Sequence, residues 1–389
     1  MAERRAPEVY SIAAHRGFAD ALVAGLVPRY ARQGLGLARL TLLLPSSRAV
    51  RTVSEAFIRH AGEGAEGGEG PMGLLMPRMV VVGDLDLDEA LGPLLDPLGA
   101  SAVPPAIDPQ RRLFALAGLI AETMGDDAPG GATLLRLARE TGATMDRLLV
   151  EDVDPADLLD DRVADIVPDL WAHWQKSLHL FATVLVKWRA FLVERGAIDA
   201  AARRNRLFDH AAERFAKHPP ATPLIAAGVT SSAPALARLL KVISELPQGA
   251  VILPDFDLTL SNEVWAELGQ AGAAPGPGET PFARDDAVTH PQYHLKLLLN
   301  RMGVAREEVR PWHRKGMAAA PPERSHAIGS LFLPPEASKV WAELPSEKRR
   351  LSGVRVMRSA NPEEEAQAIA LLVREALETP RKRIAVVTP

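Results

Sequence analysis

The chain contains short apolar segments that are each followed by a turn and an amphipathic helix. The clearest is Leu40 to Leu44, which is apolar apart from Thr41 and ends at Pro45. A strand with so little polar alternation is covered on both faces. The other members of this pattern are the predicted strands Val9 to Ala14 and Met79 to Val82 and the predicted helices Phe18 to Tyr30 and Arg48 to His60. Strand–helix alternation of this kind predicts a mostly parallel sheet with helices on both faces.

From about Asp108 to Lys217 the pattern changes to helices alone. The predicted helices are Pro109 to Met124, Ala132 to Leu149, Ile166 to Gly196 and Ala200 to Lys217. The longest helix has an apolar and aromatic stripe at helical spacing, which is typical of core packing. The stripe consists of Trp171, Trp174, Leu178, Phe181, Leu185, Trp188, Phe191 and Leu192.

The α/β pattern resumes after Pro219 and Pro220. The predicted elements are the strand Leu224 to Val229, the helix Ala233 to Leu246, the strand Ala250 to Leu253, the helix Pro291 to Met302, the strand Val354 to Ser359, the helix Pro362 to Leu377 and the strand Arg383 to Val387. We therefore predict a first α/β domain in two parts, 1–107 and 219–317, with a helical insertion at 108–218. A linker at 318–352 would precede the start of a second α/β domain at 353–389. Because the last strand has no following helix, we expect this to be part of a longer protein.

Composition excludes several classes of function. Cysteine is absent, so disulfides, thiolate zinc sites and a cysteine nucleophile are excluded. The net charge of −4 does not favour nucleic-acid binding by bulk electrostatics, so contact with DNA would need local arginine clusters. We find neither a signal peptide nor an apolar run of the roughly 20 residues that span a bilayer. We expect a soluble, cytoplasmic protein that does not contact a membrane.

An α/β sheet interrupted by a helical insertion is the organisation of superfamily-one helicases, which are P-loop NTPases. A P-loop needs glycines, a lysine for the β- and γ-phosphates and a Ser or Thr for magnesium. The corresponding turn holds one glycine and neither lysine nor hydroxyl; it is formed by His15, Arg16, Gly17 and Phe18. Asp20, close behind, would repel phosphate. The sequence therefore predicts a degenerate nucleotide site without a cofactor.

Two further requirements of an ATPase are missing. The strand Leu224 to Val229 should end in an Asp-Glu pair for magnesium and water, yet no carboxylate follows it. The next strand should end in a polar sensor such as glutamine, but Asp255 and Asp257 follow instead. Three separate defects predict that this region has no catalytic activity.

Six side chains near strand ends are candidate contacts for single-stranded DNA, and they are Ser46, Ser47, Arg48, Arg51, Thr230 and Ser231. Hydroxyl groups and arginines can hold phosphate through charge-assisted hydrogen bonds. The alternative is that the hydroxyls cap helices and that the arginines form ordinary solvated surface. The acidic residues Asp84, Asp86, Asp88 and Glu89 indicate a solvated loop rather than a metal site, and the histidines have no metal-binding spacing.

The sequence resembles the N-terminal part of the AddB family, in its alphaproteobacterial form. The resemblance is carried by Val9–Ile12, Phe18–Leu22, Leu42–Pro45 with Arg48, Arg51, Glu55 and Phe57, Leu75–Arg78, Gly83–Asp86, Ala226–Ala235, Leu246–Asp257, His290–Tyr293 and Glu364–Ala370. It implies a subunit of a helicase–nuclease that resects double-strand breaks for homologous recombination. An AddA-type partner would supply the motor, and a nuclease domain would lie beyond Pro389. Members of the family with an intact P-loop differ from this sequence, so motor activity is not implied.

Two other classes of function remain open from the sequence. The chain could be an active nucleotide-dependent α/β enzyme that uses unrecognised loops. It could also be a scaffold that binds only protein. Nucleotide binding would distinguish the first class, and the absence of contact with DNA would distinguish the second.

Overall fold

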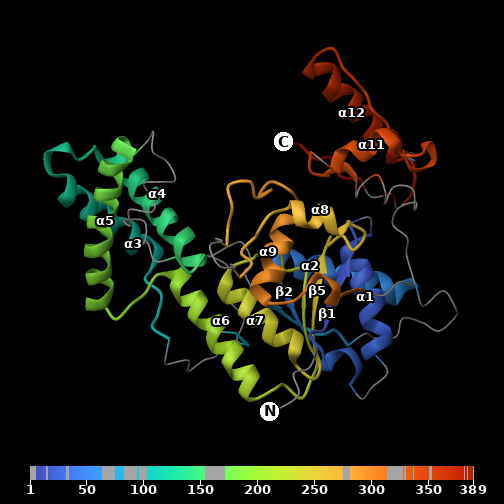
Figure 1. The fold of residues 1–389 in the computed structure, drawn as a ribbon, viewed down its shortest axis with the longest axis horizontal. Coiled ribbons are helices and arrows are strands. Elements are labelled where there is room, and N and C mark those ends of the chain that lie inside the picture. Colours follow the sequence, from blue (N-terminus) through green and yellow to red (C-terminus); the bar gives the residue numbers. More distant parts are fainter. Residues whose placement is uncertain are drawn as a thin grey trace.

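The computed structural model describes residues 6–14, 16–31, 35–63, 75–82, 94–95, 103–153, 171–274, 281–312, 327, 330–335, 337–349, 353–380, 382 and 384–388. At its centre is a six-stranded parallel sheet with the order β3-β2-β4-β5-β1-β6 (Figure 1). The strands are β1 (Val9–Ile12), β2 (Thr41–Leu44), β3 (Arg78–Val81), β4 (Leu224–Ala227), β5 (Gly249–Pro254) and β6 (Val309–Pro311). The predicted α/β class and parallel sheet are confirmed.

Helices cover both faces of the sheet. One face is covered by α1 (Phe18–Tyr30) and α2 (Ser47–Glu63), and the other by α6 (Ala200–Lys217), α7 (Pro234–Glu245) and α9 (Tyr293–Met302). Connections that lead towards β3 use the first face, and those that lead towards β6 use the second. The right-handedness of parallel crossovers requires opposite faces for opposite directions along the sheet.

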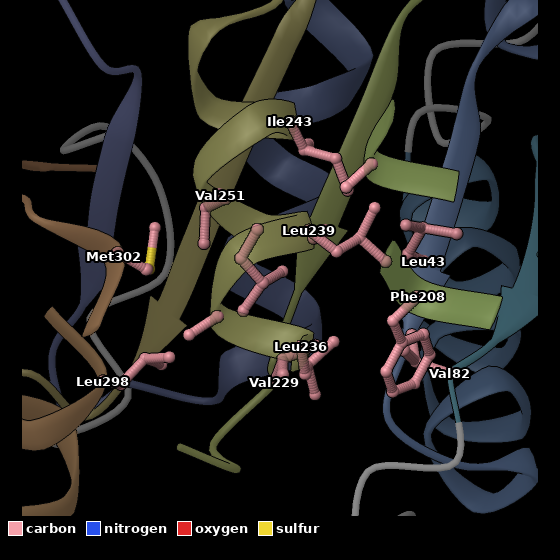
Figure 2. Packing of buried hydrophobic residues seen from close by; sticks show 14 of the residues in the cluster. Leu43, Val82, Phe208, Val229, Leu236, Leu239, Ile243, Val251, Leu298 and Met302 are labelled. Atoms are coloured by element: carbon pink, nitrogen blue, oxygen red, sulfur yellow. The ribbon is translucent and has the colours of Figure 1, made fainter. Parts of the chain in front are cut away.

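The sequence of β2 is apolar after Thr41 because the strand is buried on both faces. Leu43 packs into the core beneath α6 and α7, which Figure 2 shows together with Phe208 and Leu239. Leu42 and Leu44 pack into the opposite core beneath α1 and α2. Alternate residues of a strand face opposite sides of its sheet, so a strand buried on both sides has no polar position.

Helices α3 (Pro109–Met124), α4 (Gly131–Val150) and α5 (Trp171–Glu194) form a separate helical unit beside the sheet (Figure 1). The predicted stripe of α5 is confirmed as core packing over its described side chains. Its buried members are Leu185, Trp188 and Leu192, with Phe181 and Phe191 packed against them. The side chains of Trp171 and Trp174 lie outside the described residues.

A buried polar network holds this helical unit together. Arg112 forms ion pairs with Asp146 at 2.6 Å and with Asp199 at 3.0 Å. The indole N–H of Trp188 donates to the Asp199 carboxylate. Burial raises the pKa of Asp199, while Arg112 and Trp188 oppose that rise. The network joins α3, α4 and α5 to the residue that precedes α6.

Helix α6 connects the helical unit to the sheet. It lies in the predicted helical insertion, yet Phe208, Ala211 and Phe215 pack into the core of the sheet against α7. Arg238 of α7 pairs with Asp209 of α6 and with Asp152 after α4. The sheet and the helical unit therefore share α6.

The C-terminal segment differs from its prediction. Helix α12 (Pro362–Ala376) is confirmed, but the strands predicted at Val354–Ser359 and Arg383–Val387 are wrong for all of their described residues. Their apolar side chains are exposed, with Val356 at 87% and Val387 at 91%. A strand needs a neighbour that pairs with its backbone, and apolar composition alone does not supply one.

Several short elements have no counterpart among the predicted ones. The short strand β6 was not predicted, because three residues ending in Pro311 lack a recognisable pattern. The six-residue helix α8 (Asn262–Glu267) was also not predicted. No helix in the described ranges is long and apolar enough to cross a membrane.

The close approach of α1 to Trp312 makes Gly25 a test of the packing. A methyl group at Gly25 would overlap the Trp312 indole, whereas one at Gly118 of α3 would meet nothing within 4 Å. We expect Gly25→Ala to lower the free energy of unfolding by about 1–3 kcal/mol through overpacking. Gly118→Ala should raise it by roughly 0.5–1 kcal/mol through helix propensity. Urea unfolding measures both, and equal effects of the two substitutions would contradict the packing.

Candidate functional site

The carboxyl ends of the parallel strands bring the candidate residues to one edge of the sheet. Arg16, Gly17 and Phe18 follow β1, Ser46 and Ser47 follow β2, and Thr230 and Ser231 follow β4. In an open α/β sheet, ligands bind outside the carboxyl ends of the strands where the connections change face. That change occurs between β2 and β4 and again between β1 and β5.

The aromatic ring of Phe18, which follows β1, lies beside the glycine that follows β4. A Cβ atom at Gly228 would lie 3.1 Å from Cε1 of Phe18 and 3.7 Å from Cδ of Pro45. Gly228 has a φ of +76°, a conformation that glycine adopts without strain. The ring therefore packs on the glycine backbone immediately after β4. The side chain of Phe18 thus occupies part of the turn that was predicted as a degenerate nucleotide site.

The first turn of α1 carries an internal anion. Oδ1 of Asp20 accepts from Nη2 of Arg59 at 2.5 Å and from Nε of the same guanidinium at 3.1 Å. A carboxylate in the first turn complements the positive end of the helix dipole. The carboxylate of Asp20 therefore lies near the positive end of the α1 dipole, and the guanidinium of Arg59 from α2 holds it there. His15 lies outside the described residues.

The turn after β2 combines capping with exposed charge. Oγ of Ser46 accepts from the backbone N–H of Ala49 at 3.3 Å, so this hydroxyl caps α2. Arg48 and Arg51 are exposed, and Nε of Arg51 lies 3.4 Å from Glu55 in an exposed pair. Such a pair contributes about 0–1 kcal/mol and can open to accept phosphate.

The turn after β4 is also partly committed to capping. Oγ of Ser231 accepts from the backbone N–H of Ala233 at 3.2 Å. The guanidinium of Arg301, from α9, donates to the carbonyl oxygen of Ser232 and pairs with Glu151 at 2.8 Å. These contacts anchor the turn to α9 and to the end of α4.

A cleft of about 880 Å³ lies between the helical unit and this edge of the sheet. Its walls come from α4, α6, the turns after β4 and β5, and the start of α9. Thr230 and Ser231 are lining residues, whereas Ser46, Ser47, Arg48 and Arg51 are not. The structure therefore divides the six candidate residues between two places. The contributions of α4, α6 and α9 were missed because no local pattern links segments so far apart in the chain.

Asp255 and Gln292 shape the part of the cleft next to β5. Asp255 has a left-handed φ of +58°, and partial desolvation raises the pKa of its carboxyl group although the side chain reaches solvent. Gln292 donates to the carbonyl oxygen of Asp255 at 2.8 Å and accepts from the N–H of Asp257 at 2.9 Å. The side-chain amide of Gln292 thus binds the backbone of the turn after β5.

No group of three or more acidic or histidine side chains within the described ranges is arranged to hold a metal ion. Asp257 accepts from the backbone N–H and the hydroxyl of Thr259, which closes a local turn. The acidic residues Asp84, Asp86, Asp88 and Glu89 lie outside the described residues.

Comparison with known proteins adds no family assignment. No protein family model matches the sequence, and no curated protein matches it.

Phe18 provides a test of the packing beside Gly228. Phe18→Ala would remove a ring packed on Gly228. We expect a loss of about 3 kcal/mol in the free energy of unfolding, at the low end of the range for phenylalanine because the ring is partly exposed. Phe18→Leu should lose less, because it keeps most of the volume. Urea unfolding would contradict the packing if Phe18→Ala cost under about 0.5 kcal/mol, the size of an ordinary surface substitution.

Because of Tyr293, at the start of α9, we expect the free energy of unfolding to depend on pH in the alkaline range. Its hydroxyl donates to Asp286 at 2.8 Å, and burial together with this bond raises its pKa to about 12. The unfolded phenol ionises near pH ~10. The contribution to stability is therefore complete below about pH 10 and is lost as the pH rises towards 12. Tyr293→Phe should weaken this loss, as measured by urea unfolding at several pH values. An unchanged pH dependence would contradict the assignment.

Proposed function

We propose that this chain is a non-catalytic, helicase-like region of a double-strand-break repair subunit of the AddB type. In this proposal it holds single-stranded DNA beside an AddA-type motor subunit during end resection. The observation that carries the non-catalytic part is the closed turn after β1, where Phe18 packs on Gly228 and Asp20 pairs with Arg59. Such a role needs no cofactor in this region and implies a cytoplasmic location.

The strand order supports a degenerate nucleotide-binding sheet over an unrelated α/β fold. An ATPase would need the turns after β1, β4 and β5 to meet around one triphosphate. Here β4 pairs with β5, and β5 pairs with β1, so the three turns are neighbours. Each of the three nevertheless lacks its chemical group. The superfamily-one helicase assignment rests on this combination and on the resemblance described above.

Contact with DNA is proposed for the turn after β2. Arg48 and Arg51 are exposed there and lie one helical turn apart. Exposed arginines beside a strand end can hold backbone phosphates without reading sequence. Thr230 and Ser231, in the neighbouring cleft, could extend the path of the strand along the same edge.

Binding of a fluorescent oligothymidylate, followed by anisotropy, tests the DNA contact. We expect R48E/R51E to weaken binding and to reduce the slope of log affinity against log salt by about 1–2, since each phosphate contact releases counterions. R136E/R139E is the matched control, because both arginines are exposed and have the same spacing on α4. Equal weakening by both double substitutions, or none by R48E/R51E, would favour a scaffold that binds only protein.

Calorimetric titration with Mg²⁺ and ATP tests the closed turn. We expect no binding to the unmodified chain. Phe18→Ala should not create binding either, because lysine and the magnesium-binding hydroxyl are still missing. Saturable, magnesium-dependent binding to the unmodified chain would instead support a nucleotide-dependent enzyme.

A further inference from the structure

A groove of about 440 Å³ lies between α8 and residues of the segments 330–335 and 337–340. Its floor is apolar and belongs to a small separate core, in which Leu260 and Val264 pack with Leu333 and Ala337. We refer to it as the α8 groove.

Large apolar side chains in the segment that forms one wall of the α8 groove reach solvent, and one of them, Val340, lines the groove. Leu331 is 59% exposed, Phe332 54%, Val340 44% and Trp341 45%. They lie within eleven consecutive positions, and the Trp341 indole donates to the carbonyl oxygen of Ser330 at 2.7 Å, so the segment folds back on itself. Contiguous exposed apolar surface of this kind marks an interaction site more often than scattered single residues do.

Every charged side chain that lines the α8 groove is acidic. These are Asp257, Glu263 and Glu267. Hydrogen bonds from its own backbone and from Ser261 lower the pKa of Glu263, so it is ionised at neutral pH. Two cations lie nearby and do not line the groove: Arg306, which is bound to the carbonyl oxygens of Leu260 and Ser261, and Lys339, which belongs to the segment of the other wall. An apolar floor with an anionic rim repels phosphates and therefore disfavours nucleic acid.

We propose that the α8 groove docks a basic amphipathic helix from a partner protein. Apolar side chains on one face of that helix would pack on Leu333 and Val340, above the buried Leu260 and Val264, and its flanking lysines or arginines would meet Glu263 and Glu267. Helix-in-groove recognition uses apolar anchors in this way, and complementary charge adds specificity and faster association. The interaction is independent of the DNA contact proposed for Arg48 and Arg51.

The probe is a labelled helical peptide with leucines on one face and lysines and arginines on the other, titrated with the full chain. A control peptide keeps the leucines and replaces every basic residue with glutamate. We expect saturable binding of the basic peptide, weakened by salt because the rim charges are exposed. The acidic peptide should bind about tenfold more weakly or not at all.

Two variants of the chain locate the binding. E263Q/E267Q should weaken the basic peptide about fivefold, as expected for the loss of two exposed ion pairs. Val340→Ser should weaken both peptides, because it removes an apolar contact. E140Q on α4, also an exposed acid, is the control and should bind like the unmodified chain. Thermal unfolding of each variant checks that the fold is retained.

Several results would overturn the proposal. These are no binding of the basic peptide, equal binding of both peptides, equal effects of E140Q and E263Q/E267Q, or self-association of the chain that Val340→Ser abolishes. The last result would make a second copy the occupant. The R48E/R51E variant should bind the peptide normally, so failure at the α8 groove and failure of the DNA contact are distinguishable.

Discussion

Burial of the sheet on both faces is the constraint on which the rest of this structure depends. Leu43 faces one core while Leu42 and Leu44 face the other, and the polar residue of β2, Thr41, stands at its start. A parallel sheet of such strands places most of its polar groups in the turns beyond the strand ends. Any function at that edge of the sheet depends on what those turns contain.

The turn after β1 contains side chains that contact other parts of the fold. Phe18 packs against Gly228, and Asp20 in the first turn of α1 pairs with Arg59 of α2. A nucleotide-binding turn requires instead open backbone N–H groups and unbalanced positive charge. The neighbouring cleft is formed largely by other elements, among them α4, α6 and α9.

Apolar and charged side chains beside that cleft connect the helical unit to the sheet. Phe208 of α6 lies in the core of the sheet, Arg238 bridges Asp152 and Asp209, and Arg301 bridges Glu151 and the Ser232 carbonyl. Apolar and polar contacts together set the width of the cleft, since Val150 of α4 packs against the sheet core while Phe208 and Leu236 of that core line the cleft.

The sequence by itself determined the elements with strong periodicity, and it shows that the turn from His15 to Phe18 has no lysine, serine or threonine. Helices such as α3 and α6 have the predicted boundaries because amphipathic spacing and flanking Gly, Pro or Asp act locally. Tertiary structure alone decided the position of Gln292 beside Asp255, the ring of Phe18 on Gly228, and the failure of 354–359 to form a strand. Each of these depends on a partner distant in the chain, and periodicity carries no information about such partners.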